Sequence, residues 1–420
     1  MVKFNGGNNT NYMKNHGDYI IDVLKFHGFE AYYIGGSVRN TIHNEIHNDN
    51  LHIKDYDIVT NASYDDVSKI FSKVSDRGAQ FQVAVIETNE GFEFEVAQYR
   101  TELYDENGSL RPNEVKIAGS LQEDVKRRDF TVNALAMDRN GVVIDYVDGL
   151  KDIQNKLIRT VGEPKERFSE DPLRMLRAFR FVSQLGYSIE ENTLNGIKEN
   201  LYKLEIIPHE RVKEEFNKIL MGKYSSKALR IMKNLEIYNY NFYNSIDKRK
   251  VKFMKFFFTQ KSFDDIVNEI YLVDDLFEKY IKLYSNIEFD VAKQELLDCL
   301  FLSKNDIELL CIVVKNKDFA YNQTLDNAFR LIKSLPSKLS NKSSLNQILY
   351  FIENTYNQTI DKNMLLNRIC FTNELPFNTE SFIKQINKSA GPWVKSALDY
   401  AVEKCFYDQF SYEELLEKFY

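Results

Sequence analysis

Residues 33–39 of this 420-residue chain have the sequence YIGGSVR, and this stretch decides the fold. The apolar run at residues 31–34 predicts a β-strand that ends at Gly35 and Gly36, where a helix begins. Such a turn directs backbone N–H groups and a helix N-terminus at one point, which favours an anion. No Gly-Lys-Ser or Gly-Lys-Thr follows, so the turn is not a P-loop. A plain tight turn is the alternative interpretation.

About twenty residues later, residues 54–60 have the sequence KDYDIVT. We predict a strand over residues 56–59, and residues two apart in a strand lie on the same face. Asp55 and Asp57 would then present two carboxylates side by side, an arrangement that a divalent metal neutralises. An Asp-x-Asp pair alone is also explained by a solvent-facing strand. The glycine turn ahead of it makes the combination much more specific.

Residues 81–98 predict a β-hairpin whose turn is the sequence TNEG at residues 88–91. Glu93 and Glu95 lie two apart on its second strand and therefore share one face. A third carboxylate would complete a two-metal site, and either glutamate is placed to supply it. An exposed strand face explains both residues equally well.

Residues 127–135, RRDFTVNAL, place two arginines beside an aspartate, with an asparagine four residues further on. We predict a helix here, with Arg128, Asp129 and Asn133 on one face that suits a triphosphate and a ribose. A polar helix start that faces solvent explains this stretch equally well when it is taken alone.

Residues 170–180, EDPLRMLRAFR, predict an amphipathic helix with Asp171 as its N-cap and Pro172 at its first position. That structural interpretation leaves three arginines at three-residue spacing unexplained. They are Arg174, Arg177 and Arg180.

The two parts of the chain differ in the secondary structure that their sequence patterns predict. Short β-type runs occur up to about residue 148, and helical spacing of apolar residues continues from about residue 150 to the end. Twelve arginines lie in residues 1–180 and five beyond, which indicates a phosphate- or base-reading surface in the first part. Because the formal net charge is -7, an RNA partner needs a local basic surface. The basic stretch at residues 248–250 is one candidate in the second part.

The remaining sequence features argue against other classes of site. The four cysteines are far apart, and we expect buried thiols rather than disulfides or a zinc site. His43, His47 and His52 lie in a polar stretch, which we interpret as a solvated loop. No apolar run is long enough to span a bilayer, and the polar start of the chain lacks a signal-peptide core. We therefore expect a cytoplasmic protein.

Taken together, in this order and spacing, these stretches resemble the class II tRNA nucleotidyltransferase and bacterial poly(A) polymerase family. The resemblance covers residues 32–235 and includes YVDG at residues 146–149 and ERVKEEF at residues 210–216. It implies an α+β fold: a nucleotidyltransferase head with a small mixed β-sheet, followed by an all-helical neck, body and tail. The implied domains are the catalytic head (1–148), the neck with the nucleotide-selecting motif (149–235), and an RNA-binding body and tail (236–420).

The resemblance also implies roles for individual residues. Asp55 and Asp57 would bind Mg²⁺, as a two-metal site, and Glu95 would be the third catalytic carboxylate. Asn40 stands where the family usually has Asp, so we give that position no role. The nucleotide-binding residues that we predict, with Arg39, Arg177 and Arg180 added to those the resemblance gives, are Gly35, Gly36, Ser37, Arg39, Arg128, Asp129, Asn133, Asp171, Arg174, Arg177 and Arg180.

Within this family, Asp171 and Arg174 would select the base. Cytosine and adenine each present an amine donor beside a ring-nitrogen acceptor, whereas uracil and guanine present the opposite order. An ionised Asp accepts only and an Arg donates only, so the pair fits C and A. Two buried mismatches at about 1–3 kcal/mol each would reject U and G by roughly a thousandfold or more.

The implied reaction is template-independent addition of C, C and A from CTP and ATP to the 3′ end of tRNA, with release of pyrophosphate. Poly(A) synthesis and partial (A-adding or CC-adding) addition are the alternatives. The acidic stretch YEELLEK at residues 412–418 and the presence of residues 100–123 after the third carboxylate favour complete CCA addition. An inactive RNA-binding homologue would lack a metal carboxylate, and an appended HD phosphohydrolase would need a His-Asp pair. The sequence fits neither of these two classes.

Overall fold

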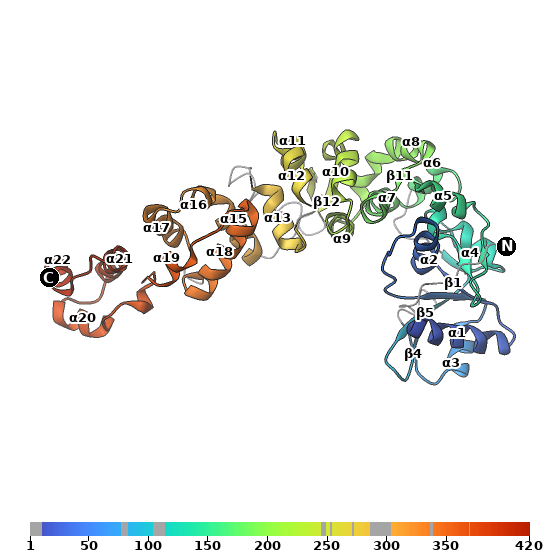
Figure 1. Ribbon diagram of the computed structural model, residues 1–420, viewed down its shortest axis with the longest axis horizontal. Helices are drawn as coiled ribbons and strands as arrows, with labels where there is room; N and C mark the ends of the chain where they lie inside the picture. The colour runs from blue at the N-terminus through green and yellow to red at the C-terminus, as the bar shows by residue number, and fades with distance from the viewer. Residues whose placement is uncertain are drawn as a thin grey trace. The chain divides into compact units, whose positions relative to one another are not determined.

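The computed structural model describes residues 11–76, 83–103, 114–244, 249–252, 254–270, 273–285, 304–336, 339–368 and 370–420. The chain divides into two compact units, residues 1–253 and 254–420. In Figure 1 unit 1 runs from blue to yellow-green and unit 2 from yellow to red. The predicted division into head, neck, and body with tail stays a prediction.

Unit 1 contains the predicted mixed sheet. In the described residues seven strands form it in the order β3-β4-β5-β2-β1-β8-β9. The pair β2–β5 is parallel and the other pairs are antiparallel. The strands are β1 (Ala31–Ile34), β2 (Asp57–Thr60), β3 (Val74–Asp76), β4 (Val83–Glu87), β5 (Glu93–Gln98), β8 (Ala136–Met137) and β9 (Val143–Ile144).

The predicted hairpin is confirmed as β4 and β5, with Gly91 in the turn at a φ of 82°. Glycine suits this position because residues with a side chain rarely adopt a positive φ. Residues 81 and 82 of the prediction lie outside the described residues. Between β2 and β3, helix α3 (Tyr64–Ile70) ends where the backbone of Phe71 becomes extended, and β3 begins at Val74.

Helices cover this sheet. Helix α1 packs on β1 and α3, α3 packs on β4, and α2 packs on β1 and α5 (Figure 1). Around Ile34, Val59 and Tyr99 lies one buried apolar cluster. The remaining elements of this part are α1 (Asn11–Phe26), α2 (Gly36–His47), α3 (Tyr64–Ile70), β6 (Arg100–Leu103), β7 (Glu114–Ile117), α4 (Leu121–Lys126), η1 (Thr131–Asn133) and α5 (Gly149–Asn155).

The rest of unit 1 is mostly helical, with α6 packed on α8 and α7 packed on α9 and α10. The expectation that everything after the head is helical was wrong in two places. Two parallel strands, β10 and β11, and an antiparallel pair, β12 and β13, interrupt the helices. The elements are β10 (Leu157–Ile158), α6 (Pro164–Glu170), α7 (Leu173–Leu185), β11 (Ser188–Ile189), α8 (Glu191–Asn200), η2 (Leu201–Ile206), α9 (His209–Leu220), α10 (Ser225–Asn234), η3 (Ile237–Asn239), β12 (Asn241–Asn244) and β13 (Arg249–Lys252).

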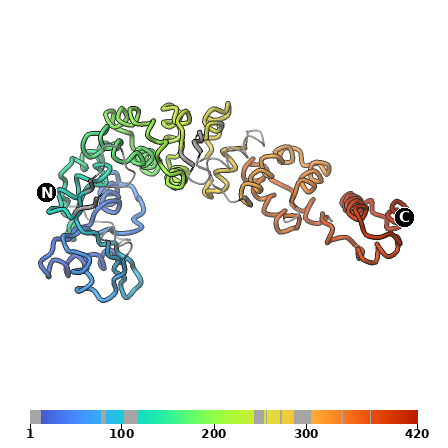
Figure 2. Tube along the Cα trace, turned by 180° about the vertical axis from the view of Figure 1, so that it is seen from behind, coloured from blue at the N-terminus to red at the C-terminus, as the bar shows by residue number. Residues whose placement is uncertain are grey.

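In unit 2, α15, α16 and α18 pack together with α13, as the yellow-to-orange trace of Figure 2 shows. A second cluster is centred on Phe382 and Ala401, where α20 packs on α22 and α21 packs on α22. The elements are α11 (Lys255–Thr259), α12 (Phe263–Glu269), α13 (Leu276–Tyr284), α15 (Lys304–Lys315), α16 (Lys317–Tyr321), α17 (Leu325–Lys333), α18 (Lys342–Tyr356), α19 (Lys362–Leu366), η6 (Thr372–Glu374), α20 (Thr379–Ile386), α21 (Pro392–Phe406) and α22 (Tyr412–Phe419).

Three of the four cysteines, Cys311, Cys370 and Cys405, are buried free thiols, as predicted. Cys299 lies outside the described residues, as do Lys248 of the basic stretch and residues 104–113 of the segment that follows the third carboxylate. In the part of the chain that the structure describes, no helix is both long and apolar enough to cross a membrane.

Candidate active site

Strand register brings the predicted catalytic residues to one edge of the sheet. Ile34, the last residue of β1, pairs with Asp57, the first residue of β2, so the glycine turn that follows β1 lies beside Asp57. Strand β2 runs parallel to β5 with Ile58 opposite Val96. Asp57 and Glu95 come one residue earlier in these two strands and therefore reach the same edge.

The carboxylates at this edge repel one another. Burial, and then the charges of Asp55 and Glu95, raise the pKa of Asp57 to about 6. Asp55 precedes β2 and does not lie in it. A strand that held both aspartates would begin at residue 55, whereas β2 begins at Asp57. The positive charge of Arg128 lowers the pKa of Asp57, so this guanidinium lies within electrostatic reach of the carboxylates.

This edge suits a divalent cation that a substrate also ligates. In the described residues no three His, Cys, Asp or Glu side chains form a ready-made metal cage. Mg²⁺ usually takes one or two protein carboxylates and completes its shell with water and substrate phosphates. The repulsion that raises the pKa of Asp57 is what a bound cation would relieve, so the residues present fit such an ion.

The glycine turn has the backbone geometry that the sequence predicts. Gly35 is the N-cap of α2, with φ 79° and ψ -135°, a conformation that favours glycine. Its side-chain-free Cα lies next to the carboxylate of Asp57, since an added Cβ would meet Oδ2 at 3.7 Å. Among the described residues no side chain caps α2, so its first N–H groups are available to an anion at this edge. The Ser37 hydroxyl donates to the carbonyl of Ile34 at 3.4 Å.

The helix predicted over residues 127–135 does not form. Helix α4 ends at Lys126, Phe130 is extended and bridges to Thr160, and only residues 131–133 form a turn of 3-10 helix. The sequence prediction failed because the backbone of Asp129 and Thr131 hydrogen-bonds to the chain around Arg159 instead of to a helical turn. The predicted side chains are nevertheless fixed, each by a different partner.

Asp124 is the partner of Arg128, and sequence reasoning missed it. Its carboxylate is fully buried and accepts from Arg128 at 2.9 Å and from Arg127 at 2.8 Å. Burial alone would raise the pKa of Asp124, but the two guanidiniums hold it below its usual value. The spacing was the available signal, because residues three and four apart on a helix are neighbours.

Asp129 and Asn133 are fixed by arginines from other elements. The Asp129 carboxylate accepts from Nε of Arg177 on α7 at 2.7 Å. Burial would raise the pKa of Asp129, yet Arg177 lowers it to about 2. The amide oxygen of Asn133 accepts from the buried guanidinium of Arg39 on α2. The structure therefore brings together residues from the glycine-turn helix, from η1 and from α7.

The other predicted residues lie in α7 or just before it, and nearby groups hold each of them. The predicted helix is α7, which spans residues 173–185, and its N-cap is Pro172 instead of the expected Asp171. The Asp171 carboxylate still accepts from the N–H of Leu173 at 3.1 Å, which is a capping contact. Arg174 is 4% exposed and donates to Glu170 at 2.9 Å.

Arg180 donates to Glu215 of α9 at 2.9 Å. Glu215 lies in the ERVKEEF stretch, but the sequence did not indicate which arginine it would contact.

The histidine cluster was interpreted wrongly. His43 and His47 lie on α2 instead of in a loop, and His43 is 2% exposed. One ring nitrogen of His43 lies 2.7 Å from the Tyr187 hydroxyl and the other 3.2 Å from the Asp49 carboxylate. The polar neighbours in the sequence gave a loop pattern, whereas the helix buries His43 against Tyr187. His52 alone lies in an exposed loop.

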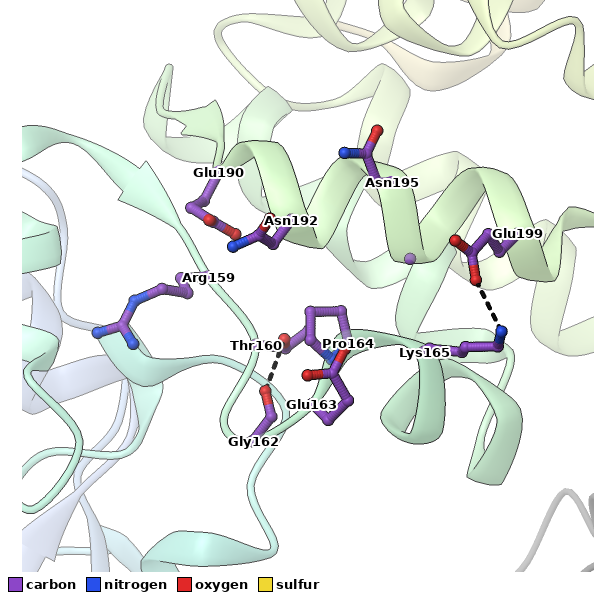
Figure 3. Close-up of a pocket in the computed structure, with 11 residues that line it drawn as sticks. Arg159, Thr160, Gly162, Glu163, Pro164, Lys165, Glu190, Asn192, Asn195 and Glu199 are labelled. Carbon is purple, nitrogen blue, oxygen red and sulfur yellow. Dashed lines mark hydrogen bonds and ion pairs between the residues drawn. The ribbon is translucent and has the colours of Figure 1, made fainter.

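A separate cavity of about 630 Å³ lies between the start of α6 and α8 (Figure 3). Arg159, Glu190 and Asn192 line one part of it, and an ion pair of 3.2 Å between Lys165 and Glu199 lies at another. None of the predicted site residues lines this cavity. It is therefore distinct from the carboxylate edge.

Comparison with known proteins agrees with this fold. The family described as "Poly A polymerase head domain" matches residues 31–159, and "Probable RNA and SrmB- binding site of polymerase A" matches residues 186–244. A crystal structure of the Bacillus stearothermophilus CCA-adding enzyme in complex with CTP has a TM-score of 0.72 and 26% identity, over 97% of this chain and 98% of that chain. The fold and the carboxylate edge thus define a nucleotidyltransferase.

Relatives in sequence place the chain more narrowly. The CCA-adding enzyme of Ligilactobacillus salivarius is 43% identical over 221 residues, which is 53% of this chain and 53% of that protein, so the match spans about half of the relative's length. The CCA-adding enzyme of Staphylococcus epidermidis is 30% identical over 406 residues, or 90% of each chain. The chain belongs to the family of CCA-adding enzymes.

The buried Asp124 generates a prediction about stability. Asp124→Asn removes the charge that neutralises two guanidiniums, and we expect the free energy of unfolding of unit 1 to fall by about 3 kcal/mol. Because the pKa of Asp124 is depressed, its stabilisation is present above the ordinary value of 3.8 and is lost as pH falls below it. Hydrogen–deuterium exchange of α4 and of the neighbouring strands, at pH 7 and at pH 3, measures both effects.

The matched control is Glu123→Gln on the same helix. Its side chain accepts from the exposed N–H of Gly119, and the amide of glutamine retains that acceptor. We expect a change within about 0.5 kcal/mol for this variant. Equal protection in the two variants would show that the Asp124 ion pairs contribute nothing to stability.

Proposed function

We propose that the chain catalyses the template-independent addition of C, C and A, from CTP and ATP, to the 3′ end of tRNA. The observation that carries the proposal is the single sheet edge where the glycine turn, Asp57 and Glu95 meet. Membership in the CCA-adding family supports the choice of substrate. In the reaction the oxygen of the RNA 3′-hydroxyl bonds to the α-phosphorus of the nucleotide, and pyrophosphate leaves.

Each residue group has a distinct part in this proposal. Asp55 and Asp57, with Glu95 nearby, would hold Mg²⁺, which supplies charge stabilisation to the phosphates. The N–H groups at the start of α2 would bind phosphate oxygens, and the Ser37 hydroxyl donates to the carbonyl of Ile34 in the same turn. Arg128 places a guanidinium near the carboxylates, where a triphosphate would lie.

Base choice falls to the start of α7. Asp171 would accept from the exocyclic amine of C or A, and Arg174 would donate to the adjacent ring nitrogen. The hydrogen bonds of Asp171 to the Leu173 N–H and of Arg174 to Glu170 hold both side chains in one orientation. A fixed orientation is what a protein edge needs to discriminate between bases.

The direct test uses a tRNA that lacks its CCA end, with CTP and ATP supplied separately and together. We expect C and C with CTP alone, and C, C and A followed by a stop with both nucleotides. An RNA primer without tRNA structure is the control and should not be extended. A long A ladder on that primer would assign poly(A) synthesis, and a stop after CC, or A added only to tRNA that already ends in CC, would assign partial addition.

A second prediction concerns the carboxylate edge. Asp57→Asn should reduce nucleotide incorporation by roughly a thousandfold or more, because the variant loses metal-held charge worth several kcal/mol in the transition state. The same change should raise the melting temperature, since it removes a partly buried charge that two neighbouring carboxylates repel.

Glu93→Gln is the matched control, because Glu93 lies on the same exposed face of β5 as Glu95. We expect this variant to retain parental incorporation. Near-parental activity of a folded Asp57→Asn enzyme would refute the catalytic role of this edge.

The third prediction separates base selection from helix capping. Asn caps helices about as well as Asp, so Asp171→Asn should fold normally. It adds a donor where only an acceptor fits C and A, and incorporation of CTP and ATP should fall together while the gap to UTP and GTP narrows by roughly tenfold or more.

Single-nucleotide incorporation of all four triphosphates, in the variant and the parent, measures this change. If the ratios among the four stay the same, Asp171 is only a structural cap, and Arg177 becomes the next residue to test as the base reader.

A further inference from the structure

Phe181 occupies an unusual position near the end of α7. Its side chain is 4% exposed, and its ring meets the ring of Phe130 edge-on, with centroids 5.6 Å apart. The guanidinium carbons of three arginines lie near the centroid of this one ring, within the range of a cation–π interaction. The distances are 5.4 Å for Arg39, 5.8 Å for Arg177 and 4.6 Å for Arg180.

The three arginines come from two helices and have unequal partners. Arg177 and Arg180, on α7, donate to carboxylates, and Arg39, on α2, donates to a neutral amide. The hydrogen-bond partners of the three cations around the ring of Phe181 therefore include two anions. The partners are Asp129 for Arg177, Glu215 for Arg180, and the amide oxygens of Asn133 and Asn40 for Arg39.

Two of the three arginines, Arg39 and Arg180, have lowered pKa values, whereas the Asp129 carboxylate raises the pKa of Arg177. Burial lowers the pKa of Arg39 to about 10, and the charge of Arg180 contributes to the decrease. Burial and the charge of Arg177 lower the pKa of Arg180. Nε of Arg180 is buried without a hydrogen-bond partner in the described part of the chain. The cluster thus retains excess positive charge that a phosphate would complement.

The ring of Phe181 is common to all three cations. An aromatic face carries partial negative charge, so it attracts a guanidinium without neutralising it. A carboxylate in the same place would hold the arginines more firmly but would cancel the charge that binds an anion. The ring can therefore keep three guanidiniums together while they remain able to bind phosphate.

We propose that Phe181 is a positioning residue that holds Arg39, Arg177 and Arg180 as one cationic cluster for the phosphates of the incoming nucleotide. The inference rests on the proposed function, because it takes the nucleotide as the ligand. Through this ring the cluster joins α2, which follows the glycine turn, to α7, at whose start the proposed base-selecting residues lie. The competing explanation is that Phe181 is an ordinary core residue whose size alone matters.

The test changes the electrostatics of the ring and leaves its shape nearly constant. Phe181 is replaced in the full-length chain by 4-fluoro-, 3,5-difluoro- and 3,4,5-trifluorophenylalanine, which weaken the negative face stepwise. Dissociation constants for CTP and ATP and the separate values of kcat and KM are measured for each protein. We expect affinity to fall in steps, to about tenfold below the parent with three fluorines, with KM affected more than kcat.

The same series at Phe179 is the matched control. Phe179 is fully buried on the same helix, and in the described residues Arg39, Arg177 and Arg180 lie over the ring of Phe181 instead of that of Phe179. The proposal predicts no trend there and equal melting temperatures within each series. A flat series at Phe181, or equal losses at Phe179 and Phe181, would overturn the inference and leave a packing role.

The outcome for the parent protein separates this inference from the proposed function. A parent that binds CTP and ATP and extends tRNA, with a flat series at Phe181, contradicts only the role of Phe181. A parent that neither binds nor incorporates these nucleotides contradicts the proposed function and, with it, the ligand assumed here.

Discussion

Strand pairing at the centre of the sheet sets the geometry of the candidate site. Ile58, Val59 and Val96 are almost fully buried, so the register of β2 against its neighbours is fixed by apolar packing. A slip of one residue would turn every side chain of β2 to the opposite face. The hydrophobic core therefore forces like-charged carboxylates together at one edge, and the raised pKa of Asp57 is the electrostatic consequence.

The arginines near the site are also positioned by groups of opposite or complementary charge. Each arginine near it is held by a polar group, and for Arg128, Arg174 and Arg180 that group is a carboxylate that sequence analysis did not assign to the site. These carboxylates are Asp124, Glu170 and Glu215. Since a buried guanidinium without a partner costs several kcal/mol, the counter-charges are as necessary to the site as the arginines themselves.

Sequence patterns predicted the local elements of the head well. The strand before Gly35, the helix after it, the hairpin at Gly91 and the helix that follows Pro172 all depend on short-range periodicity and turn chemistry, and the structure has each of them. The aspartate pair was predicted from a strand, although Asp55 lies just outside β2. Its convergence with Glu95 depends on β2 pairing with β5, and residue spacing in the sequence does not specify which strands pair.

The failures have a common physical cause. Residues 127–135 have helical spacing, but hydrogen bonds to the chain near Arg159 compete with the helical turn and win. His43 lies in a polar stretch, but contacts with Tyr187, 144 residues away in sequence, decide its environment. In both places a long-range contact overrides the local pattern, and a single sequence contains no direct signal for that contact.

The backbone bonds around Phe130 also bear on how such a chain can change by gene rearrangement. The sequence pattern changes from β-type runs to helical spacing near residue 148. Phe130 nevertheless bridges to Thr160, and Asp129 pairs with Arg177, across that position. A crossover there would leave a buried carboxylate without its guanidinium and an extended segment without its partner. Shuffling that preserves function should therefore exchange residues 1–253 as a block, with breakpoints near the boundary of the two compact units.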